Sequence, residues 1–263
     1  MNLGLENKIA LVCAASQGLG FAVADELAAE GASLIICSRG KESLERAAAA
    51  IREKHGAQIV AVTGDLSVTA DVERIVAAGI EHFGRIDILV TNTGGPPAGN
   101  FESLTAESWE AATRILLTSV LDLTRLVLPG MKARGWGRIL NITSIASKQP
   151  VDNLMLSNSL RAAVTGFAKT LAGEVAADGV TVNNILPGYT RTERLEELID
   201  FLAEKEGLTA DEVKARWAAE IPMRRLGEPH EFGALAAFLV SDRASYITGS
   251  SIAVDGGWIK SLF

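Results

Sequence analysis

Four side chains in the second half of the chain have types that could do acid–base or ligand chemistry. Ser144 follows a buried apolar run, and Tyr189 follows a Pro-Gly pair. Between them, Ser157 and Arg161 lie four positions apart on one face of a predicted helix. A serine hydroxyl can polarise a carbonyl group or hold a water molecule. Arg161 keeps its charge, so its guanidinium can bind ribose hydroxyls or an anion but cannot release a proton.

These residues lie between elements that alternate regularly along the chain. Short apolar runs are each followed by a helical segment, which is typical of parallel strands joined by right-handed crossovers. The predicted strands span residues 8–14, 33–38, 58–63, 86–91, 138–142, 180–186 and 251–254. The predicted regular helices span residues 21–30, 42–54, 71–83, 106–134, 156–177 and 228–240. The pattern predicts one α/β domain over residues 1–263, a doubly wound parallel sheet with helices on both faces.

The composition argues against several classes of protein. The net charge is −7 and no run of Lys or Arg stands out, which disfavours a nucleic-acid or anionic membrane surface. Cys13 and Cys37 would end two neighbouring strands as free thiols, and the 3 histidines show no metal-ligand spacing. The N-terminus lacks the basic and apolar regions of a signal peptide, so we expect a cytoplasmic protein without a metal.

A turn of small residues, 14–20, follows the first predicted strand and opens the first helix. Small residues at this place let backbone N–H groups approach a pyrophosphate at the helix N-terminus. An alanine at position 14 is acceptable there if its φ stays negative. The turn therefore predicts a dinucleotide site that contains Ala14, Ser16, Gln17, Gly18, Leu19 and Gly20.

The end of the second predicted strand bears on which dinucleotide binds. Ser38 and Arg39 lie there, and no acidic residue comes before Glu42. An acid at this point would bind the ribose 2′-OH of NAD, whereas an arginine accommodates the 2′-phosphate of NADP. Ser38 can donate a hydrogen bond to that phosphate, and Arg39 can form a fork on it. The sequence predicts NADP(H) in preference to NAD(H).

Motifs along essentially the whole chain resemble the short-chain dehydrogenase/reductase family. The matching positions follow successive strands and are Asp65, Leu66, Asn92, Gly94, Pro187, Gly188 and Thr192, with Val254-Asp255-Gly256-Gly257 near the end. In the family the Asp-Leu pair contacts adenine, and the threonine holds the nicotinamide amide. The resemblance implies an oxidoreductase that transfers a hydride between nicotinamide and a carbonyl or alcohol.

The catalytic positions of that family are only partly kept. In the family a serine polarises the carbonyl, a tyrosine beside a lysine supplies the proton, and an asparagine supports a water relay. Ser144 keeps the serine, whereas Ser157, Arg161 and Leu116 stand at the tyrosine, lysine and asparagine positions. The Ser157 hydroxyl stops about 4 Å short of a tyrosine hydroxyl, which leaves room for one water. A water held by Ser144 and Ser157, or the phenol of Tyr189, could supply the proton.

The overall pattern is nearest to 3-oxoacyl-[acyl-carrier-protein] reductases and predicts an NADP(H)-dependent oxidoreductase with an atypical proton donor. Because three catalytic positions differ together, a non-catalytic dinucleotide-binding sensor or partner protein is the alternative. A third interpretation is an enzyme that uses Arg161 to hold an anionic substrate for different chemistry.

Two further features concern the surroundings of this site. Residues 193–220 form two charged amphipathic helices that leave directly from a strand end, which predicts either a lid over the substrate or a surface hairpin. The long helices 106–134 and 156–177 carry an apolar stripe that could pack against a twofold mate, formed by Ile115, Leu116, Val120 and Leu123. The resemblance implies a homodimer or homotetramer.

Overall fold

Buried apolar segments form one parallel sheet in the computed structural model, which describes residues 2–262. Its strands are β1 (Ile9–Cys13), β2 (Ser33–Ser38), β3 (Ile59–Thr63), β4 (Ile88–Thr91), β5 (Gly137–Ile142), β6 (Val180–Pro187) and β7 (Ser251–Val254). Their order in the sheet is β3-β2-β1-β4-β5-β6-β7, and each pair of neighbours is parallel. Interior strands such as β1 are buried at every position because helices cover both sides.

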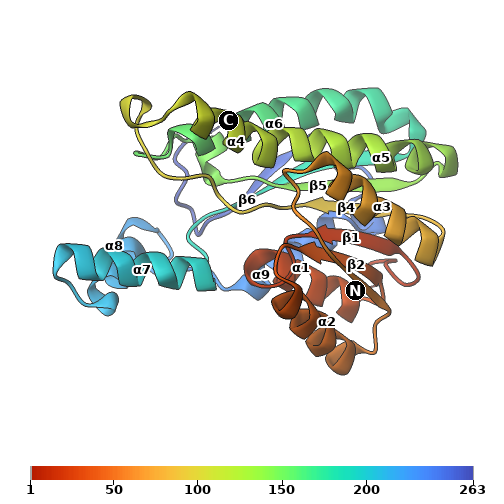
Figure 1. Ribbon diagram of the computed structural model, residues 1–263, viewed down its shortest axis with the longest axis horizontal. Helices are drawn as coiled ribbons and strands as arrows, with labels where there is room; N and C mark the ends of the chain where they lie inside the picture. Colours follow the sequence, from red (N-terminus) through yellow and green to blue (C-terminus); the bar gives the residue numbers. More distant parts are fainter. Residues whose placement is uncertain (1, 263) are drawn as a thin grey trace.

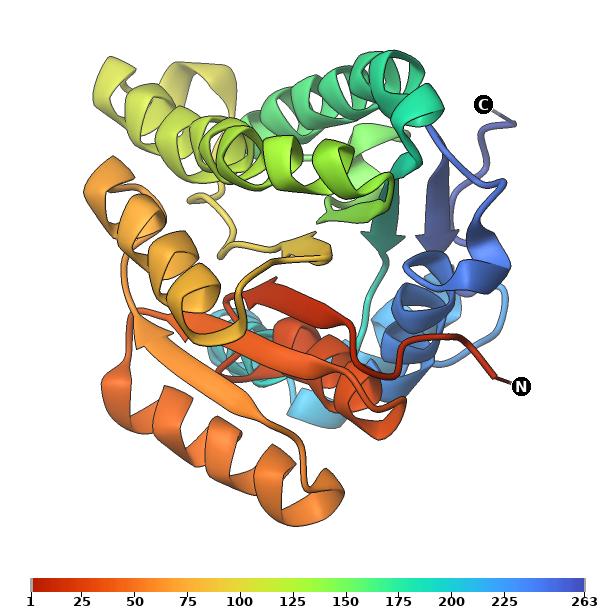
Figure 2. The ribbon, with the colours of Figure 1, turned by 90° about the vertical axis from the view of Figure 1, so that its right-hand side faces the viewer.

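Helices pack on both faces of this sheet (Figures 1 and 2). They are α1 (Gly18–Ala29), α2 (Lys41–His55), α3 (Thr69–Phe83), α4 (Ala106–Thr113), α5 (Ser119–Arg134), α6 (Met155–Val175), α7 (Glu193–Glu206), α8 (Ala210–Glu220) and α9 (Pro229–Leu239). On one face α1, α2 and α9 form a core around Leu27, Ile36 and Phe232. On the other, α3, α5 and α6 enclose Leu11 and Ile75. The predicted doubly wound α/β fold is confirmed.

The strand order places a crevice between β1 and β4. β1 pairs with β2 on one side and with β4 on the other, so the chain winds outward from this point in both directions. In open sheets of this kind, ligands bind beyond the carboxyl ends of the strands at the point of reversal. Ala14, Asn92, Ser144 and Gly188 all follow strands at that edge.

The predicted helix over 106–134 contains a π-helical turn, Arg114–Thr118, between α4 and α5. Such turns widen the helix locally and are frequent at functional sites. Leu116 lies in this turn at 3% exposure, packed with Leu156 and Leu160 of α6. Val120 and Leu123 are also buried inside the subunit. The prediction that the stripe of Leu116, Val120 and Leu123 packs against a twofold mate is therefore wrong, because these side chains already fill the subunit's own core.

Helices α7 and α8 follow β6 and project beyond the strand ends (Figure 1). They share a small apolar cluster that includes Ile199, Val213 and Trp217. Phe201 of α7 lies outside this cluster and is 58% exposed. Within residues 2–262, no helix combines the length and the apolar character needed to cross a membrane.

Candidate active site

The turn after β1 has a strained residue at its start. Ala14 has φ +49°, so the condition of a negative φ, under which alanine is readily accepted at this position, is not met. Left-handed backbone costs a residue with a Cβ about 1–2 kcal/mol. The conformation is held from two sides, because Ala15 donates to the Cys37 carbonyl at 3.1 Å and Asn92 Nδ2 donates to the Ala14 carbonyl at 3.5 Å. Tertiary contacts therefore fix a turn that alanine by itself disfavours.

Gly20 allows the first turn of α1 to pack against this strained turn. A Cβ at Gly20 would collide with the Ala14 carbonyl oxygen and would stand 2.9 Å from Nδ2 of Asn92. Gln17, the N-cap of α1, makes no side-chain capping bond. The first N–H groups of α1 therefore have no side-chain acceptor. The oxygens of a pyrophosphate can accept hydrogen bonds from them.

The residues expected around the adenosine half follow β2 and β3. Ser38 Oγ donates to the Gly40 carbonyl at 3.3 Å, whereas Arg39 is exposed and makes no ion pair or hydrogen bond with the described residues. Asp65 Oδ1 accepts from the N–H and the hydroxyl of Ser67, at 2.8 and 2.7 Å. Leu66 is buried beside it. An unpaired guanidinium next to a strand end is well placed for a phosphate.

The segment after β6 closes the other side of the crevice. The Gly188 N–H donates to the Val254 carbonyl at 3.0 Å, which ties the chain after Pro187 to the end of β7. Thr192 is the N-cap of α7 and accepts from the Leu195 N–H at 3.3 Å. Its side chain also lies against Gly18, since a Cβ at Gly18 would stand 3.6 Å from the Thr192 methyl group. The structure thus brings the turn after β1 and the start of α7 together.

Ser144 and Ser157 both keep a hydroxyl proton to donate. Ser144 Oγ accepts from the Ala146 N–H at 3.1 Å, at the start of a short 3₁₀ turn. Ser157 lies in the first turn of α6, is 7% exposed and makes no side-chain hydrogen bond with residues 2–262. A buried hydroxyl without a protein partner can bind a water or a substrate oxygen.

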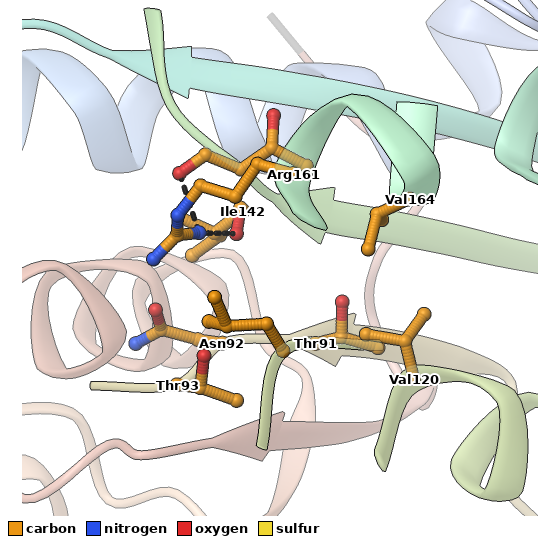
Figure 3. Close-up of a pocket in the computed structure, with 9 residues that line it drawn as sticks. Thr91, Asn92, Thr93, Val120, Ile142, Arg161 and Val164 are labelled. Carbon is orange, nitrogen blue, oxygen red and sulfur yellow. Dashed lines mark hydrogen bonds between the residues drawn. The ribbon is translucent and has the colours of Figure 1, made fainter. Parts of the chain in front are cut away.

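Arg161 lies one helical turn after Ser157 and is anchored by backbone oxygens (Figure 3). Its Nη1 donates to the carbonyls of Ile142 and Thr143, at 3.1 and 2.7 Å. Burial, with a smaller contribution from the charge of Arg194, lowers the pKa of Arg161 to about 10. The guanidinium therefore stays charged at neutral pH, with its remaining N–H groups available to a ligand.

A small cavity adjoins this guanidinium, with Arg161 and Asn92 at one end and Val120 and Val164 at the other (Figure 3). Its volume of about 10 Å³ is enough for a single water molecule. Thr143, which also lines it, has a buried Oγ1 without a hydrogen-bond partner in the described chain. A water in this cavity would satisfy that hydroxyl.

Sequence reasoning missed Thr143 and a buried polar network next to it. Thr91 Oγ1 donates to Asn141 at 2.8 Å, Asn141 to Asn184 at 3.1 Å, and Asn184 to Ser251 at 3.0 Å. The network joins the last four strands of the sheet near the cavity. Asparagines inside otherwise apolar strands were the signal, because a buried amide requires partners.

Tyr189 packs apart from the cavity at Arg161. Its ring stacks on Trp217 with centroids 5.1 Å apart and meets Trp258 edge-on at 6.1 Å. Burial, followed by the charge of Glu220, raises the pKa of Tyr189. The phenol is therefore a weaker acid than usual, and its surroundings are those of an aromatic wall. It lines a different cavity, of about 350 Å³, together with Met223 and Asp255.

Cys13 and Cys37 are adjacent because they pair in register between β1 and β2. Both are free thiols, as predicted. The described residues contain no group of three or more His, Cys, Asp or Glu side chains that could hold a metal ion.

Comparisons with known proteins agree with this geometry. A family model described as enoyl-(acyl carrier protein) reductase matches residues 13–259. The D-beta-hydroxybutyrate dehydrogenase of Cupriavidus necator is 35% identical over 260 residues, which cover 97% of this chain and 99% of the relative. The NADPH-dependent reductase BacG of Bacillus subtilis is 32% identical over 98% of this chain and 100% of its own length.

Solved structures give the same result in three dimensions. L-sorbose reductase from Gluconobacter frateurii, solved in complex with NADPH and L-sorbose, superposes with a TM-score of 0.97 at 33% identity, with 100% of both chains covered. Similarity of fold and of sequence both extend over nearly the whole chain. The chain belongs to the short-chain dehydrogenase/reductase family of oxidoreductases.

Proposed function

We propose that this protein is an NADP(H)-dependent reductase that transfers a hydride between nicotinamide and a carbonyl or alcohol. One observation carries the proposal: the strand ends that bear Arg39, Gly18, Asn92 and Ser144 meet Thr192 along one edge of the sheet. This row provides hydrogen-bond donors for an anion at one end and, at the other, the Ser144 hydroxyl, which still has its proton to donate. When bound, the coenzyme supplies or accepts the hydride.

The coenzyme half of the site, from Ala14 to Leu66, supports NADP(H) over NAD(H). Arg39 has no partner in the described part of the chain, and no carboxylate replaces it at the end of β2. The close approach at Gly20 and the uncapped start of α1 are suited to the pyrophosphate. BacG is named as NADPH-dependent, and the sorbose reductase was solved with NADPH, which supports the same choice here.

In the proton-transfer half, Ser144 donates a hydrogen bond to the substrate oxygen. A water held between Ser144 and Ser157 gives that oxygen its proton as the hydride arrives at the carbonyl carbon. The positive charge of Arg161 stabilises the negative charge left on the water oxygen. Ser157 and Arg161 take the places of the family's tyrosine and lysine in this proposal, and Tyr189 is the other proton source to be tested.

A second candidate function has its own observation. Leu116 is buried in the π-helical turn, and Arg161 is held by two backbone carbonyls, so neither can relay a proton. A chain that binds NADP(H) as a sensor, without turnover, would tolerate both features.

In either case α7 and α8 act as a lid over the substrate side of the crevice, within one domain. The subunits assemble as a homodimer or homotetramer.

The test combines NADPH binding with NADPH oxidation against a panel of ketones, quinones and oxoacyl thioesters. Binding together with turnover that falls in Ser144→Ala supports the reductase. NADPH binding without turnover on any compound, unchanged by Ser157→Tyr with Arg161→Lys, supports the sensor. Failure to bind either NADPH or NADH at low salt contradicts both functions.

A further inference from the structure

A second arginine from the lid reaches across the crevice toward Arg161. Arg194 lies in the first turn of α7, yet its guanidinium lies against Gly95, in the loop after β4. A Cβ at Gly95 would collide with Nη2 of Arg194 and would stand 2.6 Å from its Nη1. Asn92 and Thr93, just before Gly95 in sequence, line the same cavity as Arg161. The Arg194 guanidinium therefore lies against the loop whose residues Asn92 and Thr93 line the cavity at Arg161.

Neither guanidinium has a carboxylate partner. Arg194 makes no ion pair or hydrogen bond with any described residue, and Arg161 has only carbonyl partners. Arg194 is the one charged neighbour that shifts the pKa of Arg161, and it does so unfavourably. Two adjacent positive charges, one of them buried, cost free energy unless an anion compensates them.

Several other arginines near the lid form ion pairs with carboxylates. Arg191 faces Glu228 at 3.6 Å, and Arg225 holds Glu231 through bonds of 2.6 and 2.7 Å. Arg216 likewise forms an ion pair with Glu206. The chain carries a net charge of −7, so carboxylates are plentiful. Arg161 and Arg194 have no such ion pair within residues 2–262, and the carboxylate of the adjacent Glu193 lies against Gly18 instead.

We propose that the substrate is an oxo acid, a carbonyl compound whose carboxylate is held between Arg161 and Arg194. Guanidinium groups bind carboxylates through two parallel hydrogen bonds, which fix orientation as well as charge. Thr143, anchored by Arg161, directly precedes Ser144. The carboxylate would therefore lie near the hydroxyl that polarises the reacting carbonyl. This inference rests on the proposed reductase function and adds the class of substrate.

Two anions could occupy this space, the substrate carboxylate and the pyrophosphate of the coenzyme. The distinguishing experiment measures binding to the protein saturated with NADP⁺, which cannot reduce the probe. The probes are 2-oxobutanoate and 4-phenyl-2-oxobutanoate, each compared with its neutral amide by calorimetry. We expect at least one acid to bind about tenfold tighter than its amide, or more.

Variants then assign that preference to the lid arginine. Arg194→Gln should remove the preference for the acid while changing the Kd of NADP⁺ by less than about twofold, and Arg194→Lys should restore part of it. Arg191→Gln is the matched control, since Arg191 already faces Glu228, and it should keep the preference.

Three results would overturn the oxo-acid assignment. The first is equal binding of acid and amide, or binding of neither. The second is a loss of NADP⁺ affinity in Arg194→Gln with the acid preference intact, which would assign Arg194 to the coenzyme. The third is loss of the preference in the Arg191→Gln control. Turnover of neutral carbonyls with NADPH would leave the reductase function standing in each case, whereas failure to bind NADPH would remove that function itself.

Discussion

The proposed coenzyme half and proton-transfer half of the site depend on different parts of the chain, the first on backbone groups and the second on side chains. In the proposed coenzyme half, Gly20 packs against the Ala14 carbonyl because it carries no side chain, and the start of α1 has no side-chain cap on its backbone N–H groups. In the proposed proton-transfer half, the side chains of Ser157 and Arg161 come from a single helix. Backbone geometry belongs to the fold, whereas side-chain chemistry can change by substitution. A scaffold can therefore keep its coenzyme cradle while its proton chemistry is altered.

The largest expected effect comes from installing the family's usual pair in the proton-transfer half. Ser157→Tyr with Arg161→Lys should raise kcat by about 100-fold or more, because a positioned acid replaces a water. The measurement is steady-state NADPH oxidation at saturating carbonyl substrate. NADPH affinity serves as the control and should stay within about tenfold, because the turn after β1 is unaltered and lysine keeps the positive charge at position 161. A variant that binds NADPH normally yet gains no rate would show that Ser157 and Arg161 do not limit proton transfer.

Removing the hydroxyl that polarises the carbonyl should have the next largest effect. Ser144→Ala is expected to lower kcat about 100-fold to 1,000-fold, as loss of one oxyanion donor does in other enzymes. NADPH binding, followed by fluorescence titration, should not change. Ser147→Ala is the matched control, because the Ser147 hydroxyl donates to the Ser144 carbonyl at 2.8 Å. Equal rates for Ser144→Ala and the unaltered protein would place the chemistry elsewhere, with Tyr189 the next residue to replace.

A smaller effect is expected at the far end of the coenzyme half. Arg39→Ala should weaken NADPH binding by about tenfold, through the loss of a charge-assisted hydrogen bond. NADH, which has no 2′-phosphate, should bind as before. Arg46→Ala, an exposed arginine on α2, provides the control and should change neither affinity. Similar losses for NADPH and NADH in Arg39→Ala would rule out the 2′-phosphate assignment.

The smallest effect concerns stability and tests whether the cradle depends on backbone alone. Ala14→Gly should raise the free energy of unfolding by about 0.5 kcal/mol, because relief of the positive φ exceeds the entropy that glycine adds to the unfolded chain. For a chain of this size the melting temperature should rise by about 1–2 °C. Coenzyme affinity should be unaffected. A clear decrease in melting temperature would mean that the Ala14 methyl group contributes packing that outweighs the strain.

The sequence predicted the sheet and its helices because hydrophobic periodicity is local. The strands over 33–38 and 251–254 have the predicted bounds, and the others differ by one or two residues at an end. Periodicity did not reveal the π-helical turn at Arg114–Thr118, since one extra residue per turn barely changes the pattern. It also could not show which neighbour covers an apolar stripe. Leu116 and Val120 are apolar in either case, and only the position of α6 shows that the stripe is internal.

The candidate site likewise has features that the sequence predicted and features that only tertiary contacts fix. The motif residues that follow strands were named from the resemblance to the family, and the sheet brings them together because the ends of parallel strands meet at one edge. The φ of Ala14 could not be read from the sequence, since contacts from Cys37 and Asn92 fix it. The sequence offered Tyr189 as a proton source. It did not show the aromatic surroundings of this residue, because the rings of Trp217 and Trp258 come from other segments of the chain.

By itself the sequence determined the doubly wound sheet and predicted the coenzyme turn, and the family resemblance places Ser157 and Arg161 where acid–base residues are expected. Those conclusions depend on residue types and short spacings, which are read along the chain. Only the tertiary structure decided that Arg194 lies against Gly95, in the loop that also lines the cavity at Arg161, and that Thr143 lines this cavity of about one water. Such contacts join side chains far apart in sequence, and they exist only once α7 and the loop after β4 are packed across the crevice.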